Sequence, residues 1–439
     1  MGGDSHVTLN NFCGAPEHAV SRRGFLGLLG AAGAAACADM TGLQILGTPA
    51  LANELRSQQK RVIMLWLAGG ASQLETFDPK PGAVTGGPFQ SIQTSTPGIR
   101  ISELMPRMAA RLKDTCIIRS LNTRNADHGS AAKIMMRGRM GEPSVDYPDL
   151  GAVMAREMGQ EGSQVPDYVS FYTATEGRSM APGSPGFLGA RFGSMDLTTS
   201  MIPENIRRAG ASEQDHRERA ELRNLLSGNF EQGRSSTSLD SHNQAYRRVS
   251  GIMANEPLFD IEREPQRVRD RYGRTLFGRQ ALAARRLVEA GVPFVRVGRA
   301  WWDTHAQNFE SHQEMVPELD HVMVTLLDDL EERGLLRNTL VVTLAEFGRT
   351  PSINSTVGRD HFASAWSTTL SGCGIRGGSV YGRSDDTGNR VADGEIGAAR
   401  LFATIYRALG INHTKNYYLG ARPIPLTDPG TEPIREVLA

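Results

Sequence analysis

The sequence predicts an α/β fold with a mostly parallel sheet between helices, and two observations carry that prediction. Four short β-rich runs each end in a polar or glycine-rich turn, and a strong amphipathic helix separates the last two runs. A strand, a helix and a strand in this order are typical of parallel sheets with crossover helices. The four runs are residues 61–68, 116–119, 292–297 and 340–344.

The amphipathic helix is expected over about residues 317–336. Its apolar side chains recur at helical spacing, and Gly334 and Asn338 mark its end. These apolar residues are Leu319, Val322, Met323, Leu326, Leu327 and Leu330.

The middle of the chain has a different character. A charged, helical stretch over 211–229 is followed by a Gly/Ser/Thr-rich break over 231–241, after which the pattern is helical again. We interpret residues from about 205 to 290 as a helical insertion or cap on the sheet.

The N-terminus carries the pattern of a twin-arginine export signal. Residues Ser21-Arg22-Arg23-Gly24-Phe25-Leu26 precede an apolar stretch over 27–36, which is short for a membrane span of about 20 residues. Ala50-Leu51-Ala52 is a small-x-small cleavage site. We therefore expect a signal peptide over 1–52 and an α/β domain over 53–439, exported by the twin-arginine machinery to the periplasm or outside the cell. Since this route carries folded proteins, it prompts a search for a metal or cofactor site.

Composition limits the classes of protein to which this chain can belong. Of the 439 residues, 48 are Lys or Arg and 48 are Asp or Glu, so no basic excess indicates a nucleic-acid partner. After residue 52, no apolar run is long enough to span a membrane. Beyond the expected signal only Cys116 and Cys373 remain, which permits one disulfide and excludes a disulfide framework.

Carboxylates and imidazoles follow the last two strands. Asp303 and His305 come directly after the third run, and alternation in an extended segment points both side chains the same way. Glu346 ends the fourth run, and Asp360 and His361 follow a loop rich in Ser, Asn and Gly. Ligands of parallel sheets bind beyond the carboxyl ends of the strands, and these groups suit zinc and similar divalent ions. We predict one or two metal ions here; the alternative is that the same residues cap turns.

The turn after the first run adds further candidates. Glu75 is a candidate metal ligand, and Thr76 supplies a hydroxyl. Asp78 precedes a rigid Pro-Lys-Pro-Gly turn that it could simply cap, so we rank Glu75 above it.

The turn after the second run leads into a helix. His128 and Ser130 lie at the start of this helix, where backbone N–H groups can bind an anion, and Lys133 adds positive charge. Ser130 is either a nucleophile or a helix cap, with the cap favoured. Arg349, three residues after Glu346, suits bidentate contact with an oxyanion or an ion pair that braces Glu346.

These segments together resemble a known family. The motifs LWLAGGASQLETFDPKPG, NADHGSAAKIMMRGRM, WWDTHAQNF, TLVVTLAEFGRTP, GRDHF and the ending PIREVLA are similar to the domain of unknown function 1501, placed near the sulfatases in the alkaline phosphatase superfamily. The resemblance runs from about Arg61 to the C-terminus. It implies an alkaline-phosphatase-like fold and metal-assisted hydrolysis of phosphate or sulfate esters. The matching positions are Glu75, the 128–130 turn, Asp303 with His305, Glu346, and His361.

Two positions depart from that pattern. His128 stands where sulfatases carry the cysteine that becomes formylglycine, so that chemistry is not expected. Phe347 stands where phosphatase-like relatives carry a histidine ligand, so a second metal site would be incomplete.

The sequence therefore favours an exported metal-dependent hydrolase of phosphate or sulfate esters, acting on a small molecule or a polysaccharide. In this reading the metal is Zn, Mn, Ca or Mg. The metal ligands come from Glu75, Asp303, His305, Glu346, Asp360 and His361. The catalytic groups come from His128, Ser130 and Thr76, while Arg349 and Lys133 bind substrate. The alternative is an inactive relative that binds a glycan or a protein.

Overall fold

A computed structural model describes most of the chain beyond the expected signal. The described residues are 59–160, 163–171, 174–175, 178–179, 183–197, 201–203, 212–231, 246, 250–253 and 255–439. The predicted signal peptide, residues 1–52, lies outside them.

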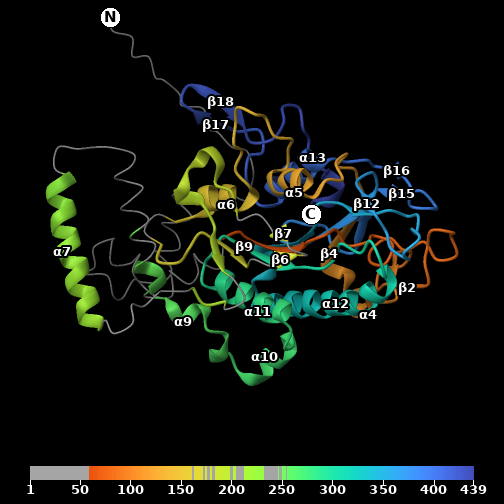
Figure 1. Ribbon diagram of the computed structural model, residues 1–439, viewed down its shortest axis with the longest axis horizontal. Helices are drawn as coiled ribbons and strands as arrows, with labels where there is room; N and C mark the ends of the chain where they lie inside the picture. Colours follow the sequence, from red (N-terminus) through yellow and green to blue (C-terminus); the bar gives the residue numbers. More distant parts are fainter. Residues whose placement is uncertain are drawn as a thin grey trace, which may run out of the picture. The chain divides into compact units, whose positions relative to one another are not determined.

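A sheet forms the centre of the fold (Figure 1). It has eight strands in the order β14-β4-β13-β10-β1-β9-β5-β8. In that order the strands are β14 (Ser379–Tyr381), β4 (Thr115–Leu121), β13 (Trp366–Gly372), β10 (Thr339–Leu344), β1 (Arg61–Leu67), β9 (Phe294–Arg299), β5 (Tyr168–Phe171) and β8 (Met195–Leu197). The four runs predicted as strands are β1, β4, β9 and β10.

The sheet is mostly parallel. Strand β1 pairs in parallel with β10 and β9, and the pairs β9–β5, β5–β8 and β14–β4 are parallel too. Strand β13 is antiparallel to both of its neighbours, β10 and β4. Every residue of β1 and β10 is buried, as expected for central strands covered on both faces. The predicted α/β fold with a mostly parallel sheet is confirmed.

Helices cover both faces of the sheet. Figure 1 shows α4 (Pro106–Ala110), α11 (Leu276–Glu289) and α12 (Asn308–Glu332) on one side and α5 (His128–Arg137), α6 (Leu150–Met158) and α13 (Ala398–Ala408) on the other. The predicted helix over 317–336 is α12, but it begins nine residues earlier, so Pro317 lies inside it rather than at its start.

The predicted insertion is only partly distinct from the sheet layer. The region about 205–290 contains α7 (Glu213–Glu231), α9 (Glu256–Phe259), α10 (Gln266–Tyr272) and α11. Helix α11 packs against β9, β1 and α12, and most of its residues are buried. Helix α11 therefore belongs to the layer that covers the sheet, and the helical insertion over about 205–290 stays a prediction.

Small antiparallel ribbons complete the described chain. They are β2 (Ser91–Gln93) with β3 (Arg100–Ser102), β6 (Ala174–Thr175) with β7 (Arg178–Ser179), β11 (Gly348–Arg349) with β12 (His361–Phe362), β15 (Arg383–Ser384) with β16 (Val391–Asp393), and β17 (Asn416–Leu419) with β18 (Arg422–Pro425). Cys116 and Cys373 are buried free thiols, so the permitted disulfide is not formed.

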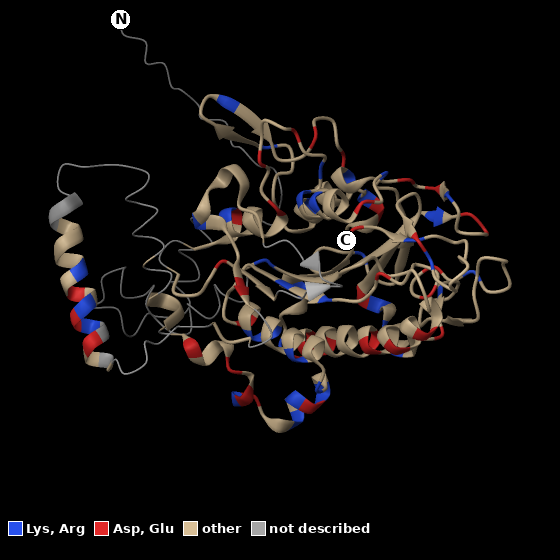
Figure 2. Ribbon diagram, viewed as in Figure 1, with Lys and Arg blue, Asp and Glu red and all other residues tan. Residues whose placement is uncertain are grey.

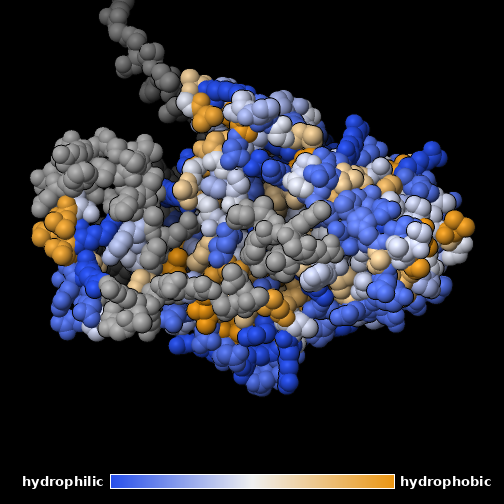
Figure 3. Space-filling view, in the orientation of Figure 1, coloured by the Kyte–Doolittle hydropathy of each residue, from blue (hydrophilic) through white to orange (hydrophobic). Residues whose placement is uncertain are grey.

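The face of the described chain that Figure 3 shows is largely polar. Charged residues are numerous along α10 and α12, whereas the central strands are mostly tan (Figure 2). The face in Figure 3 is mainly hydrophilic, with small separate apolar areas. Among the described helices, none has the length and hydropathy that a membrane crossing requires.

A buried cation joins α11 to α12. The fully buried guanidinium of Arg285 lies 2.9 Å from Asp329, 2.9 Å from Glu264 and 2.6 Å from Glu289. Asp329 also accepts a hydrogen bond of 2.9 Å from the Tyr272 hydroxyl. The helix layer on this face is thus held by charge as well as by apolar packing.

Replacing Arg285→Met should lower the free energy of unfolding by about 1–3 kcal/mol, because Asp329 and Glu264 lose one buried partner while they keep Arg333 and Arg286. Urea unfolding would measure the change. The matched control is Arg279→Met on the same helix, whose side chain is 45% exposed and whose loss should cost under about 0.5 kcal/mol. Equal unfolding midpoints for the two variants would contradict the structural role of Arg285.

Candidate metal centre

Loops from four strands meet at one edge of the sheet. The segments after β1, β4, β9 and β10 all leave from carboxyl ends, as predicted. His361 instead precedes β13, and it reaches the same edge because β13 runs in the opposite direction. The single reversed strand therefore brings a histidine to this edge from its amino end.

Asp303 is the centre of the cluster. Its Oδ2 lies 3.1 Å from Nε2 of His128, and its Oδ1 lies 3.1 Å from Nε2 of both His361 and His305. One ligand atom each from His128, Asp303 and His361 lies within 4.8 Å of the others. The residues come from three segments that are far apart in sequence.

All three imidazoles are oriented in the same way. The Nδ1 of His128 faces Glu346 Oε1 at 2.8 Å, that of His305 faces Asp360 Oδ1 at 2.7 Å, and that of His361 faces the carbonyl of Ala126 at 2.8 Å. Because these partners are acceptors, each ring can donate a hydrogen bond through Nδ1. The Nε2 of each ring points at Asp303 and is the atom that a metal ion would bind. Metal-binding histidines are held by outer acceptors in this way.

Electrostatics in the cluster favour an ionised Asp303 and a protonated His128. Burial acts to lower the pKa of His128, but the hydrogen bonds that its ring donates to Asp303 and Glu346 outweigh burial and raise the pKa to about 9. Burial acts to raise the pKa of Asp303, yet its hydrogen bonds with His128 and His361 and the charge of Arg349 hold that pKa well below its usual range. His128 must lose its second proton before Nε2 can bind a metal ion.

Arg349 holds Asp303 in place through a buried ion pair. Its side chain is fully buried, and it donates to the carbonyls of Gly69, Gly70 (3.0 Å) and Arg359 (3.1 Å) as well as to Asp303 Oδ1. The predicted contact with a substrate oxyanion is not available to a side chain buried in this way. Its partner is Asp303, where the sequence suggested Glu346.

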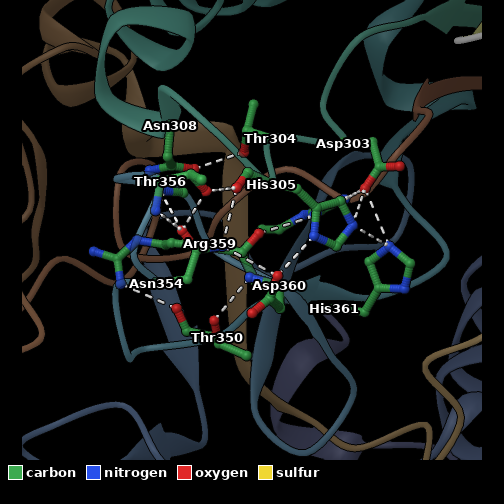
Figure 4. A network of polar contacts seen from close by, with 12 residues as sticks. Asp303, Thr304, His305, Asn308, Thr350, Asn354, Thr356, Arg359, Asp360 and His361 are labelled. Atoms are coloured by element: carbon green, nitrogen blue, oxygen red, sulfur yellow. Dashed lines mark hydrogen bonds and ion pairs between the residues drawn. The ribbon is translucent and has the colours of Figure 1, made fainter.

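The loop over 350–360 positions His305 and Asp360 at the rim (Figure 4). Asn354 Nδ2 donates to the carbonyl of His305 at 2.9 Å and to Asp360 Oδ1 at 3.2 Å. Thr356 Oγ1 donates to the same carbonyl at 2.7 Å. The hydrogen bond from His305 lowers the pKa of Asp360, so this carboxylate is ionised. His305 and Asp360 are about half exposed, unlike the rest of the cluster.

Phe347 fills the position behind two of the imidazoles. Its buried ring lies 4.4 Å from the ring of His361 and 4.9 Å from that of His128, measured between centroids. An aromatic ring here fixes the imidazoles by packing and offers no ligand atom, which fits one metal ion better than two.

Glu346 and Gly69 link the first strand to the cluster. Glu346 Oε1 accepts from the backbone N–H of Gly69 at 2.8 Å, while its buried Oε2 has no hydrogen-bond partner among the described residues. Gly69 has φ of +107°, and a Cβ there would lie 2.4 Å from the backbone nitrogen of Asp303. Only glycine permits this approach between the two loops.

Glu75 lies apart from the cluster. Its side chain is fully buried, and Oε1 pairs with the equally buried Arg359 at 2.8 Å. Arg359 also donates to backbone carbonyls, including that of Thr85 at 2.8 Å. Glu75 was predicted to be a metal ligand. In the structure it pairs with the buried Arg359 and not with an imidazole of the cluster around Asp303.

The predicted hydroxyl nucleophiles are engaged elsewhere. Thr76 is buried and donates to the carbonyl of Ser72 at 2.7 Å. The hydroxyl of Ser130 donates to Asn125 Oδ1 at 3.0 Å and to Asp127 Oδ1 at 2.8 Å. Asp127 caps α5 by accepting from the backbone N–H of Ser130 at 2.9 Å, so Asp127 is the cap that was expected at Ser130. Lys133 lies on the exposed side of α5.

Sequence reasoning missed several supporting side chains. Gln73 holds the backbone of Arg349 with its side-chain amide: Nε2 donates to the Arg349 carbonyl at 2.8 Å, and Oε1 accepts from the Arg349 N–H at 3.0 Å. His312 is fully buried and accepts from the backbone N–H of Ser72 at 3.1 Å. Arg359, Asn354 and Thr356 were also missed, although their loop was noted for its Ser, Asn and Gly content. No local pattern reveals partners that are hundreds of residues away.

A family model covers nearly the whole described chain. The family described as "Protein of unknown function (DUF1501)" matches residues 59–438, so the chain belongs to this family. A comparison with curated proteins gives no match.

Solved structures show low similarity. Ps i-CgsB in complex with k-i-k-neocarrahexaose has 10% identity and a TM-score of 0.40, over 81% of this chain and 73% of that one. The PsFucS1 sulfatase from Pseudoalteromonas sp. has 12% identity and a TM-score of 0.36, over 82% and 69%. Alkaline phosphatase from the Antarctic bacterium TAB5 has 14% identity and a TM-score of 0.36, over 81% and 99%. Similarity at this level indicates nothing about what this chain binds or catalyses.

The separation of Glu75 from the cluster can be tested. Glu75→Gln should lower the free energy of unfolding by about 3–5 kcal/mol, because Arg359 loses its buried counter-charge. Metal content per folded molecule should not change. The control is Glu103→Gln, an exposed carboxylate near the same turn. Loss of metal from Glu75→Gln without loss of stability would restore Glu75 as a ligand.

Proposed function

We propose that the chain is a metal-dependent hydrolase of phosphate or sulfate esters. The observation that carries the proposal is the common orientation of three imidazoles, each held at Nδ1 by an acceptor and directed through Nε2 at the Asp303 carboxylate. Turn capping requires no such arrangement. Membership in the family with its resemblance to sulfatases and phosphatases supports the reaction class.

His128, Asp303 and His361 fit a zinc-like ion. Two ligands bound tetrahedrally at about 2.0–2.1 Å lie roughly 3.3 Å apart. Asp303 Oδ2 lies 3.1 Å from Nε2 of His128, and Asp303 Oδ1 lies 3.1 Å from Nε2 of His361. Two nitrogens and one oxygen favour zinc over calcium or magnesium, which prefer oxygen ligands. Three protein ligands are the usual number in catalytic zinc sites. A bound ion would polarise the ester oxygen and lower the pKa of a water molecule.

We assign His305 to general base catalysis. It is 47% exposed, whereas His128 is 16% and His361 is 22% exposed. Its Nδ1–H is fixed by Asp360, so the lone pair on Nε2 faces the cluster and can accept a proton from water. With Thr76 and Ser130 engaged in structural hydrogen bonds, water is the nucleophile that this site favours. Arg349 keeps Asp303 ionised and in place.

A binding protein is the second candidate. The hydroxyl groups of Thr76 and Ser130 are not directed at the cluster, and Phe347 removes a ligand position. These observations suit a metal-containing module that binds an anionic glycan or a protein without turnover. Assays with aryl phosphates and aryl sulfates on metal-loaded protein separate the two candidates.

We also propose that the chain is exported. Ser21 to Leu26 would direct the folded protein to the twin-arginine machinery, and the metal centre supplies a reason for folding first. A site assembled from the ends of β4 and β9 and the start of β13 exists only once the sheet has formed. The substrate would then be a phosphorylated or sulfated small molecule or polysaccharide in the periplasm or outside the cell.

Purified protein should contain one zinc-like ion per chain by elemental analysis. His361→Ala should weaken metal binding by more than about 100-fold, since loss of an outer partner alone costs about 10–100-fold. The control is His413→Ala, which changes a histidine far along the chain and should keep the metal. Wild-type protein without stoichiometric metal would rule out the proposed function.

His305→Gln should lower kcat by about 100-fold or more while metal content stays the same, as expected for loss of a general base. Asp360→Asn should have a smaller effect in the same direction, because it disturbs only the orientation of the ring. Rates on aryl phosphates or sulfates and parallel metal analysis provide both readouts. If His305→Gln loses its metal, His305 is a fourth ligand and not the base.

A further inference from the structure

Trp301 has an unusual backbone conformation beside the metal centre. It lies two residues before Asp303, its φ is +75°, and its side chain is 57% exposed. A bulky residue at positive φ is a genuine outlier, because its Cβ crowds the backbone. Glycine or asparagine would adopt this positive φ with less backbone strain.

The neighbouring tryptophan shows that exposure is specific to Trp301. Trp302 is fully buried, and its ring lies 5.4 Å from that of His312. Trp66 and Trp366 are also at most 2% exposed. The chain contains four tryptophans, and Trp301 alone presents its ring to solvent.

Other strained residues lie in the same loops. Arg124 precedes His128, Gln307 follows His305, and Val357 precedes Asp360, and each has positive φ. Met201 is the other described non-glycine residue with this conformation. Strain concentrated at one site indicates function, since folding alone does not select for it.

We propose that Trp301 is the stacking platform for the pyranose ring of a sugar phosphate or sugar sulfate whose ester group is bound at the metal centre. This inference rests on the proposed function and names its substrate class. A pyranose has an apolar face that packs on an aromatic ring and hydroxyl groups around its edge. The half-exposed His305 lies 3.1 Å from Asp303 and pairs with Asp360, so these two residues supply polar partners for such an edge beside the metal centre.

Fluorescence offers a direct test because one tryptophan is accessible. Acrylamide should quench the emission of Trp301 in the full, metal-loaded chain. Glucose 6-sulfate, galactose 6-sulfate and the corresponding 6-phosphates are the probes, and inorganic sulfate and phosphate are the controls. At least one sugar ester should reduce the quenching by about twofold or more, as expected when an exposed ring is covered, whereas the inorganic anions should not.

Trp301→Gly separates binding from folding. Glycine relieves the strain at positive φ, so the unfolding temperature should stay the same or rise. Metal content should not change, while affinity for the protecting sugar ester should fall about tenfold. Trp301→Phe should retain most of that affinity. The matched control is Tyr418→Gly, which removes another exposed aromatic ring (68%) and should leave sugar binding intact.

The outcomes are distinct. Failure of every sugar ester to protect Trp301 in metal-loaded protein overturns the inference and leaves the proposed function standing. Protection by an aryl sulfate but by no sugar ester also overturns the substrate class, as does equal sugar affinity in wild type and Trp301→Gly. Absence of metal from the wild type contradicts the proposed function itself, and metal analysis shows this before any quenching is measured.

Discussion

The Asp303 carboxylate is the interaction on which the site depends. Its two oxygens face three imidazoles and the buried guanidinium of Arg349, so segments from three loops share one negative charge. A buried cation without such a partner is strongly destabilising. Arg349 in turn holds the carbonyls of the β1 loop. The positions of the loop after β1, the loop after β9 and the β11–β12 ribbon therefore depend on the ionisation of the Asp303 carboxylate.

Around this carboxylate the polar residues form an inner and an outer set. Arg349, Gln73, Glu75 and Arg359 are buried and bonded to one another or to the backbone, so their conformations are fixed by packing. His305 and Asp360 lie at the rim and are reachable by solvent. A rigid support beneath an accessible set of groups is what precise ligand geometry requires. This arrangement explains why carboxylates of similar sequence context, such as Glu75 and Glu346, have different neighbours.

Much of the fold followed from the sequence, because apolar runs and helical spacing report burial directly. The four strands, the long helix and the meeting of Asp303, His305, Glu346 and His361 at one edge were predicted. The roles of individual polar residues were not, since they depend on partners distant in the chain. Glu75 pairs with Arg359, which is 284 positions away in the chain. Arg349 pairs with Asp303, although Glu346 is only three residues away from Arg349. The reversed direction of β13 leaves no periodic signal, because parallel and antiparallel buried strands share one pattern.

That reversal has a consequence for how the site assembles. Strands β10 and β13 are antiparallel neighbours, and the connection between them, residues 345–365, carries Glu346, Arg349, Asp360 and His361. Closing this short connection costs less chain entropy than joining β1 to β9, which are separated by more than 200 residues. We expect this half of the site to form first as a local hairpin. The Asp303 segment would dock later, as the slow, long-range step that completes the centre.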